Sequence, residues 1–401
     1  MTGRLTSIRR AASPAPPWPL FWLATTVVWT FPHGVAQWWS AVLDLFGATP
    51  NPASTVFGSD LLRVADLVDL VPPLVIAAAV LTVFGAGLRG RVIESRFRLR
   101  ARFPAPTVVA ITEFARAHLP HVEVLANLNR TDLPAFAYFR TPRKPRLAVF
   151  APLVVLWQED RAAAEAVLRH ELHHCRQGDN ALLGVVSPLE FVIRHWPVLF
   201  ACTVLIPTAS LWLADSISFL SSVDSRGVPH TFTQLVKLAV PDLVLMLISS
   251  ASLLLAAITM PVAASWSAEL NADHMAAGAT PQAMIDAIGR AGTTGGIRPW
   301  LVSRLTHPPR ALRKALLRGG RRTTAVAAVA CYPLAWLALL GWELVAANAV
   351  WLFLRLPPGM IGAENRHAVG IWCANLWPVW LAAAAFALLW PFLRHAWTLR
   401  R

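Results

Sequence analysis

The feature that most constrains the fold of this chain is a set of six long apolar stretches. Each approaches the roughly 20 residues that a helix needs to cross a hydrocarbon core of about 30 Å. They lie at Trp18–Trp39, Leu67–Leu88, Trp196–Leu213, Leu238–Val262, Thr324–Leu344 and Val369–Phe392. Charged residues make up only 14% of the chain, whereas soluble domains carry about a quarter. The sequence therefore predicts a predominantly α, polytopic membrane protein with about six transmembrane helices.

The basic residues between these stretches indicate an orientation. Arginine and lysine concentrate in 89–103, in 310–322 and in the C-terminal tail, and they are sparse in 43–66, 214–237 and 355–368. Because cytoplasmic loops carry the excess of Lys and Arg, we expect a multi-pass cell-membrane protein with both termini and both polar blocks in the cytoplasm. The net charge of +14 then reflects this bias. We expect the lipid bilayer as a partner and no nucleic acid, since no basic and aromatic stripe falls on a soluble module.

One polar block carries a motif with metal-binding spacing, His170-Glu171-Leu172-His173-His174. A helix is expected over Glu159–Gln177, because acidic residues begin it and Gly178 follows its end. Positions i and i+4 share a helical face, so His170 and His174 can bind one metal ion together. Glu171 is turned about 100° from His170. It can reach a water on the open side of the metal and accept its proton without being a ligand.

A third ligand has to come from elsewhere, because a catalytic zinc takes three protein ligands and keeps one open position. Glu269 and Asp273 are the candidates, again at i and i+4, on a helix that continues from the fourth apolar stretch. One of them can bind the metal while the other orients a ligand histidine. The alternative is that both only solvate a helix at the membrane surface. We predict one Zn²⁺ per chain.

These motifs resemble the M48 family of integral membrane zinc proteases (the HtpX and CAAX prenyl protease type) over roughly residues 95–320. Further matching pieces are Gly178-Asp179, Thr306-His307-Pro308-Pro309 with Arg313 downstream, Ala135-Phe136-Ala137 and Arg146–Phe150. Pro134 departs from the family, which often has Asn before Ala-Phe-Ala. The resemblance implies a cytoplasmic zincin-type α+β catalytic domain built from two chain segments. It also implies that the chain is a zinc endopeptidase. Its expected substrates are proteins or peptides, membrane proteins included.

The resemblance implies a role for most of the matching residues. The metal ligands would be His170, His174 and Glu269. The catalytic residues would be Glu171 as general base and His307 as the oxyanion donor. Asp273 would be a carboxylate that contacts a ligand histidine, and Arg313 would lie near the site without an assigned role. A substrate would lie extended along an edge strand near Leu147–Phe150, by strand addition.

The expected organisation has five regions. They are an N-terminal transmembrane hairpin (1–88), a catalytic segment with HExxH (89–195), a central hairpin (196–262), a catalytic segment with the Glu269 and His307 motifs (263–323), and a C-terminal hairpin (324–401). His173 is expected on a polar helix face, and Cys175 is not expected to bind metal.

Two alternatives remain open. A signalling protease of the M56 type (BlaR and MecR) also carries HExxH between membrane spans, but the full-length receptors have a large extracellular sensor that this chain lacks. A non-catalytic membrane scaffold is the other, and the intact ligand set with Glu171 argues against it.

Overall fold

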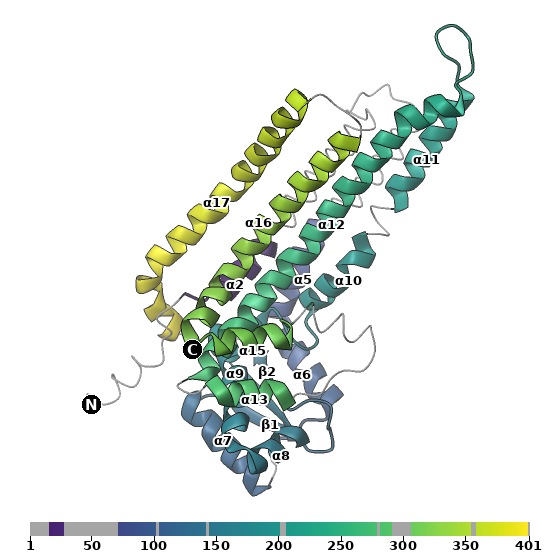
Figure 1. Ribbon diagram of the computed structural model, residues 1–401. Helices are drawn as coiled ribbons and strands as arrows, with labels where there is room; N and C mark the ends of the chain where they lie inside the picture. Colours follow the sequence, from purple (N-terminus) through teal and green to yellow (C-terminus); the bar gives the residue numbers. More distant parts are fainter. Residues whose placement is uncertain are drawn as a thin grey trace.

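The structure is a computed structural model that describes residues 16–27, 71–101, 104–141, 144–200, 206–278, 281–290, 305, 307–353 and 358–399. Its described part is mostly helical with one small sheet. Long helices run side by side, and the sheet gathers with shorter helices at one end (Figure 1). The elements at that end are α6 (Ala86–Phe97), α7 (Pro106–His118), β1 (Glu123–Asn127), β2 (Ala135–Thr141), β3 (Lys144–Phe150), α8 (Ala151–Glu159), α9 (Arg161–Gln177), η2 (Asp179–Ala181), α13 (Pro281–Arg290) and α15 (Arg310–Arg318). The others are α2 (Trp18–Thr25), α5 (Val71–Phe84), α10 (Pro188–Phe200), α11 (Ile206–Ser221), α12 (Phe232–Ala277), α16 (Arg321–Phe353) and α17 (Pro358–Leu399).

The sheet has three strands in the order β1-β3-β2, with β1 parallel and β2 antiparallel to β3. The short strand predicted at Arg146–Phe150 is therefore confirmed, but its expected position at an edge is wrong. Strand β3 is central because apolar residues fill both of its faces, so neighbours cover it on every side. The free edge beside α9 belongs to β2.

Alternate residues of β3 enter two different apolar clusters. Leu147 and Val149 join a cluster with residues of α7, α8 and α9, whereas Ala148 and Phe150 pack with Ile93 of α6. This period of two is the geometry of an extended strand. The sheet thus lies between α6 on one face and α7, α8 and α9 on the other, which fixes α9 against the sheet.

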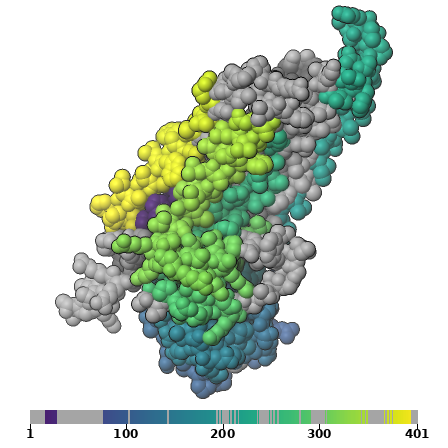
Figure 2. All heavy atoms as spheres, viewed as in Figure 1, coloured from purple at the N-terminus to yellow at the C-terminus, as the bar shows by residue number. Residues whose placement is uncertain are grey.

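Helix α12 joins the two ends of the molecule. Its 46 residues correspond to about 69 Å at 1.5 Å per residue, more than twice a hydrocarbon core of about 30 Å. The predicted fourth apolar stretch lies within it, and the last part of the helix packs against α9. Residues 104–141, 144–180 and 307–320 gather at one end of the molecule (Figure 2), and α9 of the first polar block packs there against α13 of the second.

The number of membrane spans differs from the prediction. Among the residues that the structure describes, two helical stretches are long and apolar enough to cross a membrane, Arg321–Ala346 and Leu376–Leu393. They match the fifth and sixth predicted spans. A third is possible if Ile76–Phe84 and Ala86–Phe97, which are bent by 73°, form one span. The support is thus for two or three spans in place of six. The first and third predicted spans run into 28–39 and 201–205, which lie outside the described residues.

Both spans carry large apolar side chains that point outward, among them Leu337, Leu388 and Phe392. Apolar surface of this extent is unusual on a soluble protein and suits contact with lipid. These helices indicate a membrane protein.

Candidate metal centre

Helix α9 forms where its sequence predicts a helix. The Asp160 side chain accepts a hydrogen bond from the Ala163 N–H at 3.0 Å and so caps the first turn. The helix ends at Gly178, whose φ of 80° is a conformation that glycine adopts without strain. Between these caps, His170 and His174 occupy one face, one turn apart.

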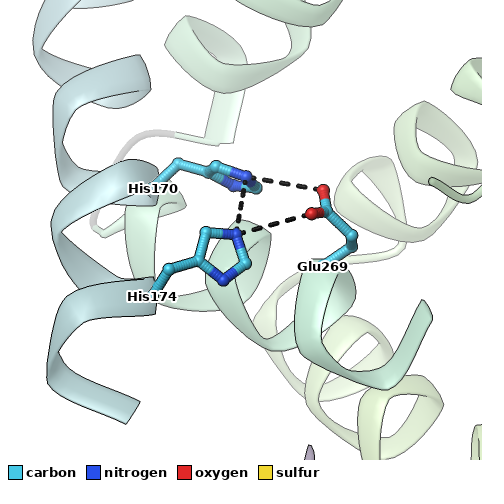
Figure 3. Close-up of side chains that lie close together, drawn as sticks. All are labelled: His170, His174 and Glu269. Carbon is cyan, nitrogen blue, oxygen red and sulfur yellow. Dashed lines mark hydrogen bonds and ion pairs between the residues drawn. The ribbon is translucent and has the colours of Figure 1, made fainter. Parts of the chain in front are cut away.

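The two histidines meet Glu269 of α12 in a small triangle (Figure 3). The Nε2 atoms of His170 and His174 are 3.3 Å apart. Glu269 Oε2 lies 3.5 Å from His170 Nε2, and Glu269 Oε1 lies 3.5 Å from His174 Nε2. All three residues are largely buried. Within the described residues, this is the group of His, Cys, Asp and Glu side chains that could hold a metal ion.

The spacing of this triangle fits zinc. With zinc–ligand bonds of 2.0–2.1 Å, two ligand atoms at a tetrahedral angle lie about 3.3–3.4 Å apart, close to the three distances above. Two imidazole nitrogens and one carboxylate are a ligand set that catalytic zinc sites use. Glu269 Oε2 is buried and makes no hydrogen bond, which is costly for a carboxylate oxygen unless a cation approaches it.

The other nitrogen of each histidine faces a carboxylate. His174 Nδ1 lies 2.9 Å from Asp179 Oδ2, and His170 Nδ1 lies 3.0 Å from Asp273 Oδ1. The first contact is a hydrogen bond. The second is an ion-pair contact, because His170 Nδ1 makes no hydrogen bond. A carboxylate at Nδ1 favours the tautomer with its proton there, so both Nε2 lone pairs point to the same spot. That arrangement suits a cation between them.

The charges of the site act on one another. Burial alone would lower the pKa of His170, but its close contacts with Asp273 and Glu269 and their negative charges raise it to about 9. Burial alone would raise the pKa of Glu269, but the charge of His307 and the close contacts with both histidines hold it well below its usual value. The site therefore keeps Glu269 ionised, which is the form that binds a metal.

Arg313 of α15 has a clear partner. Its Nε and Nη2 donate to Asp273 Oδ2 and Oδ1 at 2.6 and 2.5 Å, and its Nη1 lies 4.0 Å from Glu269 Oε2. Such a two-pronged pair fixes the carboxylate in direction as well as in place. Arg313 thus holds Asp273 where it faces His170, a contact that the sequence did not reveal.

Glu171 points toward the sheet. Its Oε2 accepts a hydrogen bond from the Ala137 N–H of β2 at 2.9 Å. Ala137 pairs in register with Leu147 of β3, and this bond shows that its N–H points the other way, toward α9. Glu171 therefore links strand β2 to the turn of α9 that carries the ligand candidate His170.

His307 reaches the same place from the second polar block. It lies three residues before α15, its Nε2 is 3.6 Å from Glu269 Oε1, and more than half of its side chain is exposed. The structure thus brings together the sequence-predicted residues His170, Glu171, His174, Glu269, Asp273, His307 and Arg313.

The expectation for one neighbouring residue changes. His173 is buried instead of lying on a polar face, and its Nε2 is 3.1 Å from Asn271 Nδ2 of α12. Cys175 is also buried, and burial raises the pKa of its thiol to about 12. Asp179 received no role from the sequence, although its place just after Gly178 could have suggested that it folds back onto His174.

The site combines His170 and His174 of one helix, the carboxylate of Glu269 from a second helix, and Glu171 beside the edge of the sheet. This combination is typical of zinc metallopeptidases. Residues 107–320 match peptidase family M48. No curated protein and no solved structure gave a significant match to the chain. Because the match covers more than half of its length, the chain belongs to peptidase family M48, which favours this interpretation over the M56 alternative.

Proposed function

We propose that this chain is a membrane-embedded, zinc-dependent endopeptidase that holds one Zn²⁺ between His170, His174 and Glu269. The observation that carries the proposal is the triangle of ligand atoms, 3.3 to 3.5 Å apart, with a carboxylate behind each histidine. Zinc in such a site lowers the pKa of a water molecule and polarises the carbonyl of the substrate.

Glu171 is the general base in this proposal. It follows a ligand histidine directly, so its carboxylate is within reach of a water beside the ligand set without belonging to that set. It accepts a proton from the attacking water and passes it to the leaving amine. His307 donates a hydrogen bond to the carbonyl oxygen as negative charge develops on it. Its exposed ring next to Glu269 leaves it accessible to a substrate.

Strand β2 is the place for the substrate backbone. In an antiparallel pair, alternate residues direct their N–H and C=O groups away from the partner strand. Ala135, Ala137 and Phe139 share that phase, and Ala137 already makes an outward bond to Glu171. An extended peptide that pairs with these residues lies beside the general base, with backbone contacts that accept many sequences.

The charge bias supports a location for the site. The basic segments favour the cytoplasmic membrane face for the catalytic segments at 89–195 and 263–323. Substrates at that face are proteins or peptides, and those embedded in the membrane can reach the site without leaving it.

The test separates the ligands from the base. Purified His174→Ala and Glu269→Ala proteins should lose zinc, measured by elemental analysis, whereas Glu171→Gln should keep one zinc per chain. Cleavage is followed with a library of quenched fluorescent peptides. Wild-type turnover in the Glu171→Gln protein would contradict the proposed base, and zinc retained in both ligand variants would contradict the proposed site.

A further inference from the structure

Arg89 is a buried cation that holds the segment following the zinc helix. It lies in the first turn of α6, close to the 73° bend between Ile76–Phe84 and α6, and it is only 5% exposed. Its guanidinium donates four hydrogen bonds to backbone carbonyls, those of Asn180 (3.0 Å), Ala181 (3.2 Å), Leu183 (2.7 Å) and Val185 (3.1 Å).

The backbone has to curl tightly to bring these carbonyls to one group. Gly184 has a φ of 97° and Val186 a φ of 59°. Positive φ is unfavourable for a β-branched residue and persists only where surrounding contacts enforce it. Glu190 adds to these contacts, because its Oε2 accepts from the Gly184 N–H at 2.5 Å. The shape of 180–185 therefore depends on Arg89 on one side and Glu190 on the other.

This segment begins next to the carboxylate that orients a metal ligand. Asp179 is 2% exposed, its Oδ2 contacts His174 Nδ1 at 2.9 Å, and its Oδ1 accepts from the Asn180 N–H at 2.7 Å. Arg89 holds the carbonyl of that same Asn180. A continuous path of contacts thus leads from Arg89 through Asn180 and Asp179 to His174.

We propose that Arg89 is a positioning residue of the metal centre. By holding 180–185 in its curled form, it keeps Asp179 where the carboxylate fixes the tautomer and direction of the His174 ring. This inference rests on the proposed metal site. Arg89 would also connect the helix pair α5 and α6 to the ligand set, because α6 continues from α5 across the bend.

Arg89→Lys tests the proposal. Lysine keeps the positive charge. Its single ammonium nitrogen, however, cannot contact all four carbonyls that the three nitrogens of the arginine guanidinium contact. Removing a contact behind a ligand histidine costs 10- to 100-fold in metal affinity. We expect the zinc affinity of the full-length protein, measured by competition with a chelating dye, to fall about tenfold, at the lower end of that range. The absorption bands of the Co²⁺-loaded protein should also change, because they report the direction of the ligands.

Arg146→Lys is the matched control. Arg146 of β3 is also a buried arginine, but it pairs with Glu94 of α6 and Glu123 of β1 and contacts no residue of 180–185 in these pairs. The Arg146→Lys variant should lower the folding stability of the protein without changing its zinc affinity or its Co²⁺ spectrum. A double variant tests the path itself. If Arg89 acts through Asp179, then Arg89→Lys should cost little further affinity once Asp179→Asn is present.

Other outcomes would overturn the inference. These are unchanged zinc affinity in a folded Arg89→Lys protein, or fully additive losses in the double variant. If Arg89→Lys does not fold, Gly184→Ala perturbs the same segment. Its Cβ would lie 3.3 Å from Arg89 Nη2 at a positive φ, so it too should weaken zinc binding, and unchanged affinity there would count against the proposal. A wild-type protein that binds no zinc would instead contradict the proposed function.

Discussion

Replacing Asp273 by asparagine separates the two tasks of that carboxylate. Asp273 is fully buried, faces His170 Nδ1 at 3.0 Å, and accepts two hydrogen bonds from Arg313 at 2.6 and 2.5 Å. Asp273→Asn keeps the size of the side chain but removes its charge. His170 then loses the anion that orients it, and Arg313 loses its counterion in a buried place.

The two losses have different magnitudes. Loss of a carboxylate behind a ligand histidine lowers metal affinity by 10- to 100-fold, or about 1.4–2.8 kcal/mol. Breaking a buried ion pair costs about 3–5 kcal/mol of folding free energy. We expect the lower end for stability, near 3 kcal/mol, because Glu269 is still 4.0 Å from Arg313 and asparagine keeps one acceptor oxygen.

The assay measures both quantities on the same protein. Zinc affinity is obtained by chelator competition, and stability by thermal unfolding in lipid nanodiscs. Asp132→Asn is the control, because Asp132 forms an exposed pair with Arg130 and should cost no more than about 1 kcal/mol. An Asp273→Asn protein with wild-type zinc affinity would refute the reasoning that this carboxylate orients His170.

Three further predictions follow from the site and the helices. The His307→Asn variant can still cap the start of a helix, so it should keep its zinc. Its kcat should fall at least about tenfold with little change in KM, a cautious part of the range for one oxyanion donor. Near-normal turnover would mean that His307 has only a structural role. In a cysteine-free background, a membrane-impermeant reagent should label Cys at Ser225 from outside and should not label Cys at Glu159, and the reverse pattern would contradict the proposed orientation. Chelating the zinc should lower the Tm of the wild-type protein and leave that of Glu269→Ala unchanged, and equal shifts in both would mean that the stabilising metal lies elsewhere.

The parts of the site that a local pattern encodes were predictable from the sequence. The bounds of α9 follow from Asp160 and Gly178, and the pairing of His170 with His174 follows from the helical period. Glu269 and Asp273 were the expected partners, but the spacing alone left open which of them binds the metal. The structure places Glu269 beside both Nε2 atoms and Asp273 behind His170.

The parts that depend on contacts between distant segments were not predictable. Arg89 counted as one of many basic residues of a cytoplasmic loop, because nothing local distinguishes a buried arginine from an exposed one. The central position of β3 was missed for a similar reason, since strand order is set by neighbours far along the chain. Hydropathy likewise marks apolar length, but it does not show that the stretch near Leu88 is broken by a bend.

The carboxylates behind the two histidines come from different parts of the chain, and this ties metal binding to the fold. His174 is oriented by Asp179, which follows α9 directly, whereas His170 is oriented by Asp273, which lies on α12 with Glu269. The ring of His174 is therefore oriented by contacts within residues 89–195, through Asp179, Asn180 and Arg89. The ring of His170 is oriented only after α9 and α12 have packed together. The proposed zinc ion, which needs both histidines and Glu269, would bind tightly only to the assembled pair of helices, so its binding free energy would stabilise the junction between the two polar blocks.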